Sequence, residues 1–589
     1  MRLQYAIFLI SPLADVTASK LPKKDHGEAL NSYPSGGKNR PKHRACWKGK
    51  YDINTDYDTN WPETGVTRRY DLAITNGTAS PDGVRRQMFL INGEYMGPTL
   101  YADWGDHVEI TVTNNLQDNG TGIHWHGIRQ WRTNGEDGVP GVTECPLAPG
   151  HSKVYRWQAT QYGTSWYHSH WGVQYADGVL GMMVINGPST ANYDVDLGPF
   201  SVSDWYYETA SARSWTVAHS FGRPPTIADT GLINRTMVSK EGTGSYGVTV
   251  IKKCKKYKLR LINASVDNHF KVSLDRHTFE VIAADFVPVK PKKVDWLFMA
   301  IGQRYDVIIR ANQPVDNYWF RAEVQDRVGP DCGRNANNGN IKSIFRYRGA
   351  PVRDPTTRGT PYTQSCSDEA VTPYRHTSVP RKPLAEAGQL NTAIDLGVNN
   401  QGQSVVKWGI NTTPMNVGWD KPTLQYVMEG NDNYPEAMNL ISLPKPDKAC
   451  WNYWIFQEVK GTQISISIPH PVHLHGHDFW VLGQGVGNFS ETGGSTLEYH
   501  NPVRRDTTML PAGGWVVVAF KANNPGAWLF HCHIAWHAAQ GMAVQFLEAE
   551  SKISAIRAPA THLAKTCKSW GKYYPKHAAY LKDADDSGI

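Results

Sequence analysis

The 589-residue chain lacks the long apolar run that a membrane-spanning helix needs. Such a helix requires about 20 consecutive apolar residues, and no segment approaches that length. Charge is also sparse, with 20% charged residues and a formal net charge of +7. The basic residues are scattered apart from a short run at 252–256, which is typical of a solvated strand edge. We therefore expect no membrane insertion and no nucleic-acid partner.

Cysteine pairs with zinc-site spacing are missing as well. None of the eight cysteines forms a Cys-x-x-Cys pair, so they are disulfide partners, spare thiols or metal ligands. The sequence is instead rich in 53 Gly, 36 Pro and 11% aromatic residues. This composition suits a loop-rich β protein and argues against disorder and against a coiled coil.

Short apolar runs broken by turn residues recur along the chain, for example at 68–75, 107–112 and 258–263. They predict an all-β protein, and the length favours three domains. We expect domains at 46–188, 189–350 and 384–589, with a proline-rich linker at 351–383 and a helical segment from about residue 550 to 580. An apolar stretch at 5–10 before small residues at 16–18 predicts a signal peptide at 1–18, followed by a pro-segment or flexible arm at 19–45.

The tripeptide His531-Cys532-His533 can join two metal sites. Side chains alternate faces along an extended strand, so its imidazoles point one way and its thiolate the other. Imidazole suits copper, zinc and iron, whereas a thiolate beside imidazoles and a soft thioether is typical of blue copper. The tripeptide therefore predicts a covalent path for electrons between two sites.

Each end domain carries two His-x-His pairs, and the middle domain carries none. The pairs are His124 with His126, His168 with His170, His473 with His475, and His531 with His533. This self-match suggests duplicated domains that meet face to face. Eight imidazoles exceed the needs of one metal ion and fit a cluster of three. A zinc hydrolase would leave most of them unexplained.

Cys532 can complete a second site with His470 and His537. His470 lies three residues before His473 and outside the His-x-His alternation, so it is free to turn toward Cys532. These three residues form the trigonal set of a blue copper site, and Met542 is a candidate weak axial ligand. Met542 is equally suited to core packing.

With these motifs, the sequence resembles the multicopper oxidases. It closely resembles the secreted laccases of filamentous ascomycete fungi. The resemblance covers roughly residues 45 to 589. It rests on four motifs, which are His124-Trp125-His126-Gly127, His168-Ser169-His170-Trp171, the stretch from His470 to His477, and the stretch from His531 to His537.

The resemblance implies three cupredoxin-like Greek-key β-sandwich domains and four copper ions. Type 1 copper would take His470, Cys532 and His537, and type 2 copper His124 and His473. The type 3 pair would take His126, His168, His170, His475, His531 and His533. The resemblance also implies disulfides Cys145–Cys567 and Cys332–Cys366, which leaves Cys46, Cys254 and Cys450 spare.

The resemblance implies further roles near the metals, each with an ordinary structural alternative. Asp137 would relay protons, or it is simply an Asp before a turn Gly. Trp536 would wall the donor pocket, or it is a packing aromatic. The C-terminal Asp586-Ser587-Gly588-Ile589 would plug a channel toward the cluster, as the tail does in relatives.

The sequence departs from these laccases at two positions. Met542 stands where they usually carry Leu, and we predict that Met lowers the type 1 potential. Where many have a donor-binding carboxylate, the nearest match in this sequence is Ser245.

The implied activity is one-electron oxidation of phenols or aromatic amines coupled to four-electron reduction of O₂ to two waters. The alternatives are an ascorbate oxidase, a bilirubin oxidase, a ferroxidase or a non-catalytic copper-binding protein. We expect a secreted, N-glycosylated monomer. Its Asn-x-Ser/Thr sequons lie at Asn76, Asn119, Asn234, Asn263, Asn411 and Asn488.

Overall fold

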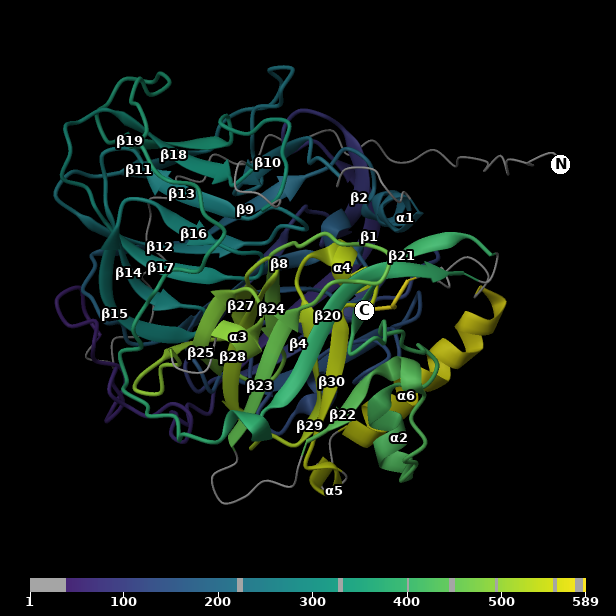
Figure 1. The fold of residues 1–589 in the computed structure, drawn as a ribbon. Helices are drawn as coiled ribbons and strands as arrows, with labels where there is room; N and C mark the ends of the chain where they lie inside the picture. The colour runs from purple at the N-terminus through teal and green to yellow at the C-terminus, as the bar shows by residue number, and fades with distance from the viewer. Residues whose placement is uncertain are drawn as a thin grey trace, which may run out of the picture.

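The computed structural model describes residues 39–219, 226–326, 332–399, 402–443, 451–492, 496–553, 559–577 and 586–589. Its strands form three β-sandwiches, which we call domains 1, 2 and 3 in chain order (Figure 1). The all-β, cupredoxin-like prediction is confirmed. The predicted signal peptide and most of the predicted arm lie outside the described residues.

Domain 1 pairs a sheet in the order β2-β1-β4-β6 with a sheet in the order β3-β8-β7-β5. Its strands are β1 (Thr67–Ala79), β2 (Arg86–Ile91), β3 (Gly97–Asp103), β4 (His107–Asn114), β5 (Ile123–Trp125), β6 (Ser152–Gln158), β7 (Gly163–Ser169) and β8 (Leu180–Asn186).

Domain 2 pairs the order β10-β9-β12-β17-β14-β15 with the order β11-β19-β18-β13-β16. Its strands are β9 (Val195–Trp205), β10 (Thr230–Ile233), β11 (Val248–Ile251), β12 (Lys256–Asn263), β13 (Phe270–Leu274), β14 (Phe279–Ala284), β15 (Val287–Val294), β16 (Leu297–Met299), β17 (Arg304–Arg310), β18 (Asn317–Val324) and β19 (Lys342–Tyr347).

Domain 3 pairs the order β21-β20-β23-β28-β25-β26 with the order β22-β30-β29-β24-β27. Its strands are β20 (Gly388–Val398), β21 (Ser404–Ile410), β22 (Leu440–Ser442), β23 (Trp451–Glu458), β24 (His470–Leu474), β25 (Phe479–Val486), β26 (Val503–Arg505), β27 (Thr507–Leu510), β28 (Gly514–Lys521), β29 (Gly526–Cys532) and β30 (Ala543–Glu548).

Domains 2 and 3 have the same strand order in both sheets, element for element, and domain 1 has a shorter version of it. The repeat predicted from the histidine motifs therefore extends to the middle domain, which has the same topology without the motifs. The predicted domain limits are not tested by this topology and stay predictions. Residues 351–383, all of them described, contain no helix or strand.

Two strands show how local sequence sets burial. In β4, Val108, Ile110 and Val112 are buried and alternate with polar residues, which is the pattern of a strand with one face in the core. In β29, every residue is buried. This strand lies between β30 and β24 inside its sheet, so it needs apolar or metal-binding side chains on both faces.

Short helices lie at the ends of the domains and over their edges. They are α1 (Ala210–His219), α2 (Thr423–Glu429), α3 (Phe489–Thr492), α4 (Ala535–Ala539), α5 (Glu550–Ile553) and α6 (Pro559–Tyr573), with 3₁₀ turns η1 (Asn134–Glu136), η2 (Gln174–Asp177), η3 (Leu384–Glu386), η4 (Glu436–Met438) and η5 (Tyr574–Lys576). The helices α5 and α6 confirm the predicted helical C-terminal segment within its described part. In the described ranges, the structure has no helix that is both long and apolar enough to cross a membrane.

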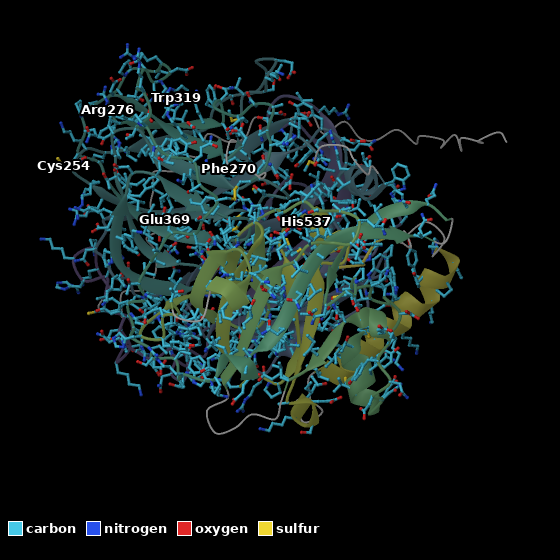
Figure 2. All side chains as sticks on the ribbon, in the orientation of Figure 1. Cys254, Phe270, Arg276, Trp319, Glu369 and His537 are labelled. Carbon is cyan, nitrogen blue, oxygen red and sulfur yellow. A yellow bond between two sulfur atoms is a disulfide. The ribbon has the colours of Figure 1, made fainter. Side chains whose placement is uncertain are left out.

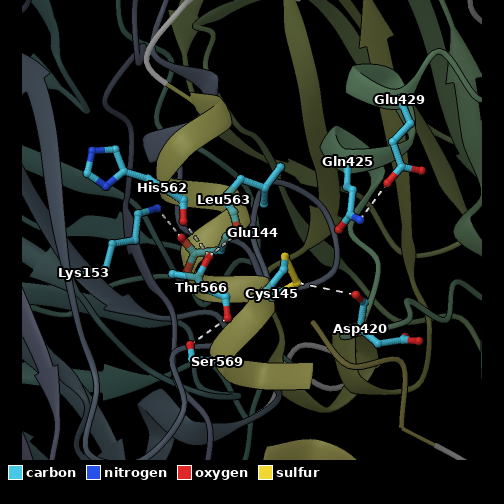
Figure 3. Close-up of a disulfide and its surroundings, with 11 residues drawn as sticks. Glu144, Cys145, Lys153, Asp420, Gln425, Glu429, His562, Leu563, Thr566 and Ser569 are labelled. Carbon is cyan, nitrogen blue, oxygen red and sulfur yellow. Dashed lines mark hydrogen bonds and ion pairs between the residues drawn. A yellow bond between two sulfur atoms is a disulfide. The ribbon is translucent and has the colours of Figure 1, made fainter. Parts of the chain in front are cut away.

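Both implied disulfides are present. Cys145 of domain 1 joins Cys567 of α6 across 422 residues, and Cys332 joins Cys366 across 34 residues. Figure 3 shows α6 beside Cys145 and next to Lys153 and Glu144, which form a buried ion pair. Cys46 and Cys254 are free thiols, and Cys450 lies outside the described residues.

Candidate functional site

His470, Cys532 and His537 converge on one point in domain 3. The Cys532 sulfur lies 3.6 Å from His470 Nδ1 and 3.7 Å from His537 Nδ1, and these two nitrogens are 3.1 Å apart. All three side chains are buried. Figure 2 labels His537 near the middle of the molecule, far from Cys254 at the outer edge of domain 2. We call these three residues the entry group.

Strand pairing positions the entry group. Val472 pairs with Cys532 across β24 and β29, and the His533 N–H donates to the Pro471 carbonyl at 2.7 Å. His470 at the start of β24 therefore lies close to the end of β29. The chain then turns into α4, which brings His537 back beside Cys532.

Three hydrophobic residues, Met542, Trp536 and Trp408, belong to the same core cluster as Cys532. Met542 is fully buried in the same core cluster as Cys532, and its carbonyl accepts a hydrogen bond from the Cys532 N–H at 3.1 Å. Trp536 is buried and its ring packs edge-on against Tyr206 at 5.9 Å. The ring of Trp408 lies 4.7 Å from that of His470 and 4.6 Å from that of His537. Trp408 was not predicted, because no motif or spacing in the neighbouring sequence identifies it as a residue near the entry group.

The other histidines form one buried cluster between domains 1 and 3. Pairing of β5 with β7 places His124 opposite His168, and pairing of β24 with β29 places His473 opposite His531. The rings of domain 1 then stack directly on those of domain 3. His124 lies 3.8 Å from His475, and His126 lies 3.9 Å from His473. The structure thus brings together all eight imidazoles that the four motifs contribute.

His531, Cys532 and His533 alternate as the strand argument predicts. His531 Nε2 lies 3.3 Å from His475 Nε2, and His533 Nε2 lies 3.3 Å from His126 Nδ1, both within the histidine cluster. The Cys532 sulfur points the other way, to the entry group. The tripeptide therefore connects the two sites covalently.

The outer ring nitrogens are held by hydrogen bonds that leave the inner nitrogens available as ligands. Nδ1 of His124 lies 3.0 Å from the Asp137 carbonyl, that of His473 lies 2.8 Å from the Asp506 carbonyl, and that of His168 lies 3.1 Å from the Ser169 carbonyl. If each Nδ1 carries the proton, each Nε2 presents a lone pair.

These lone pairs are the strongest sign of a metal cluster. The Nε2 atoms of His124, His168 and His473 and both ring nitrogens of His170 are buried and, within the described part of the chain, have no hydrogen-bond partner. An unpaired buried polar atom is costly. Metal ions bound between these nitrogens would satisfy them, so the residues present fit such a cluster.

Burial keeps the imidazoles of His168, His473, His475 and His531 neutral. Desolvation lowers the pKa of His168, His473 and His475 well below the usual value, and neighbouring histidines lower it further. Desolvation by burial also lowers the pKa of His531, to about 3. Neutral imidazole is the form that binds a metal ion.

Asp137 contacts the cluster from domain 1. Its Oδ2 lies 2.8 Å from His475 Nδ1, and its Oδ1 lies 3.2 Å from His124 Nδ1. The carboxylate is fully buried. Asp137 thereby orients one histidine from each end domain.

Domain 2 contributes two residues that the sequence argument missed. Gly302 has φ +82°, and a Cβ there would lie 3.0 Å from His533 and 3.2 Å from His126. Arg304 pairs with Asp506 through two contacts of 2.6 Å, and the Asp506 carbonyl in turn holds His473. The middle domain therefore supports the cluster without supplying a ligand.

A small cavity of about 20 Å³ adjoins the cluster and is lined in part by His170, His531 and Ile589. The last residues lie in the protein interior. The Ser587 N–H donates to the Ala539 carbonyl at 2.7 Å, and Trp419 Nε1 donates to the Gly588 carbonyl at 2.9 Å. Ile589 is 2% exposed.

The structure does not bring Ser245 to the entry group. Ser245 is exposed in the turn before β11, and its N–H donates to the Met237 carbonyl. The preceding Gly244 lies against Asp82 of domain 1, so the turn folds onto domain 1. Two acidic side chains act on the entry group. Glu458 Oε1 lies 3.8 Å from His470 Nε2 and is buried, and the charge of Asp267 helps to raise the pKa of the Cys532 thiol after the larger effect of burial.

Three cupredoxin-like sandwiches with this buried histidine and cysteine arrangement define a multicopper oxidase. Models of the multicopper oxidase family match residues 73–190, 196–350 and 411–552. The chain therefore belongs to the multicopper oxidase family, and four copper ions are its cofactor.

The most informative relatives are fungal laccases. Laccase-3 of Botryotinia fuckeliana is 57% identical over 459 residues, covering 76% of this chain and 99% of that one. The laccase of Neurospora crassa is 45% identical and covers 94% of this chain and 89% of that one. The crystal structure of the Botrytis aclada laccase matches with a TM-score of 0.86 and 38% identity, covering 94% of this chain and 100% of that one.

Proposed function

We propose that this protein is a laccase that oxidises phenols and aromatic amines one electron at a time and reduces O₂ to two waters. The observation that carries the proposal is the placement of Cys532. Its sulfur lies in the entry group, while both neighbouring imidazoles lie in the histidine cluster. A copper-storage protein would not need a cysteine between two cluster ligands.

We assign the ligands by the groups that the structure brings together. The entry group, with Met542 as a weak thioether ligand, would hold type 1 copper, and His124 with His473 would hold type 2 copper. The type 3 pair would be held by His126, His168, His170, His475, His531 and His533. When bound, copper supplies one-electron redox chemistry that takes electrons singly and delivers four to O₂.

The protein contributes orientation, exclusion of water and proton handling. The buried rings lie in fixed positions, because carbonyls and the Asp137 carboxylate hold their outer nitrogens. Asp137 touches His475 and His124 and is the group we propose to relay protons to reduced oxygen. Trp536 and His537 would form one wall of the donor-binding pocket. Asp267 would supply the donor-binding carboxylate near this pocket, in place of the predicted Ser245.

Secretion, N-glycosylation and a monomeric state are also proposed. Two disulfides are typical of an oxidising compartment. Asn76, Asn234, Asn411 and Asn488 are exposed and suit glycosylation. Asn263 does not, because it is fully buried and its amide donates to two backbone carbonyls.

The donor class is tested by oxygen uptake with a phenol, ascorbate, bilirubin and ferrous iron measured side by side. We expect the phenol to give the highest rate at equal concentration. A higher rate with ascorbate, bilirubin or ferrous iron would assign the protein to the corresponding alternative oxidase. Oxygen uptake with none of them would favour a non-catalytic copper protein.

A further inference from the structure

Two exposed imidazoles far from the copper motifs lie against each other. His376 belongs to the proline-rich segment 351–383, and His500 precedes β26 in domain 3. Their ring centroids are 4.2 Å apart. His376 Nε2 lies 3.0 Å from His500 Nε2 and 3.2 Å from His500 Nδ1. Nothing in the oxidase reaction uses this pair.

Backbone pairing fixes the two histidines on neighbouring segments. Ser378 and His500 form an antiparallel bridge. It is flanked by hydrogen bonds from the Val379 N–H to the Tyr499 carbonyl and from the Asn501 N–H to the Thr377 carbonyl, each 2.9 Å long. Residues on one face of such a pair lie within side-chain reach diagonally, so the closeness of the imidazoles follows from the register.

The spacing suits a divalent transition-metal ion. Bonds of about 2.0–2.1 Å in tetrahedral geometry place two ligand nitrogens roughly 3.3 Å apart, which the observed separations approach to within a few tenths of an ångström. Glu498, two residues before His500, is the carboxylate that could become a third donor. Its Oε1 accepts a hydrogen bond from the His500 backbone N–H at 2.5 Å, so the other carboxylate oxygen would have to bind the ion. Imidazole and carboxylate together suit Zn²⁺ and Cu²⁺.

We infer that His376, His500 and Glu498 form a surface site for a divalent transition-metal ion, separate from the four copper positions. An ion bound there would join segment 351–383 to domain 3. Because the two segments meet only in the folded chain, the ion would stabilise the fold by mass action. The simpler alternative is a hydrogen bond between the two imidazoles, which would need no metal ion.

Calorimetric titration of the four-copper enzyme with Zn²⁺ tests the site, with copper content measured before and after. We expect one Zn²⁺ per chain and no loss of copper. His376→Gln and His500→Gln should each weaken binding by about tenfold or more, and Glu498→Gln should weaken it less. His151→Gln, at an exposed histidine of domain 1, is the matched control and should bind as the parent does.

A second measurement uses the unfolding temperature. Zn²⁺ should raise it in the parent and in His151→Gln, but not in His376→Gln or His500→Gln. The inference is overturned if the parent binds no Zn²⁺, or if the His376 and His500 variants bind it as tightly as the parent.

Discussion

At the residue scale, the burial of Cys532 shows why the entry group is a metal site rather than a reactive thiol. Burial raises the pKa of the Cys532 thiol far above its usual value, so the protein alone keeps the sulfur protonated. A bound metal cation reverses this, because it deprotonates a coordinating thiol. Desolvation also lowers the pKa of His537, so its imidazole stays neutral and able to bind the same cation.

Met542 is the residue that should set the potential of the entry group. A thioether donor stabilises the oxidised metal, so Met542→Leu should raise the reduction potential. We expect a rise of at least about 59 mV, which is a tenfold change in the equilibrium constant for one electron. Redox titration of the blue absorption band measures it, and an unchanged potential would show that Met542 is only a core residue.

His269 should contribute to acid sensitivity. Burial lowers its pKa to about 3, from the usual 6.5. The unfolded chain therefore binds this proton first as the pH falls, and the free energy of unfolding decreases between pH 6.5 and about 3. The slope from one such histidine is about 1.4 kcal/mol per pH unit.

Urea unfolding across that pH range, compared between the parent and His269→Gln, measures the contribution. The variant should lose the part of the slope that corresponds to one proton, because glutamine can still accept from the Ile301 N–H but does not titrate. His151→Gln should leave the parent's pH dependence unchanged. Equal slopes in the parent and His269→Gln would contradict the assignment.

The residues that could be predicted from the sequence are those with local spacing. The His-x-His pairs follow from strand alternation alone. His470 and His537 could be predicted because each lies a few residues from a His-x-His pair in the sequence. Trp408, Gly302 and Asp267 reach the site only through tertiary packing, so no local signal marks them. Ser245 lies in a turn that folds onto domain 1, and its role in donor binding stays a prediction.

At the element scale, strands were predictable where one face is buried, as in β4, because apolar residues then alternate with polar ones. The helix α1 was not predicted. Only Ala210 and Ala218 among its residues are buried, so its sequence carries little periodicity. Its position over α4 and β21 is a tertiary property.

The C-terminal segment 586–589 should control access to the histidine cluster. Deleting it removes Ile589 from the cavity wall and breaks the hydrogen bonds of Ser587 and Gly588. We expect altered turnover or altered copper content, measured by oxygen uptake and by copper analysis. Ile589→Leu keeps an apolar side chain of the same volume and should behave as the parent. A truncated enzyme with normal turnover and four coppers would contradict a plug.

At the scale of the whole molecule, buried ion pairs join the domains. Arg304 of domain 2 and Asp506 of domain 3 are both fully buried and meet through two 2.6 Å contacts. Arg304→Met leaves the Asp506 carboxylate buried without its cation, which should cost about 3–5 kcal/mol. Arg304→Met combined with Asp506→Asn should cost less than the single change, as urea unfolding can measure. Equal losses in the two variants would contradict the cost assigned to an uncompensated Asp506 carboxylate.

Cys532 should link an electron entry site to a cluster that reduces O₂ completely. The ratio of phenol oxidised to O₂ consumed by the copper-loaded enzyme tests this, with hydrogen peroxide assayed in the same reaction. We expect four phenols oxidised by one electron each for every O₂, with no peroxide released. A ratio of two with stoichiometric peroxide would contradict it.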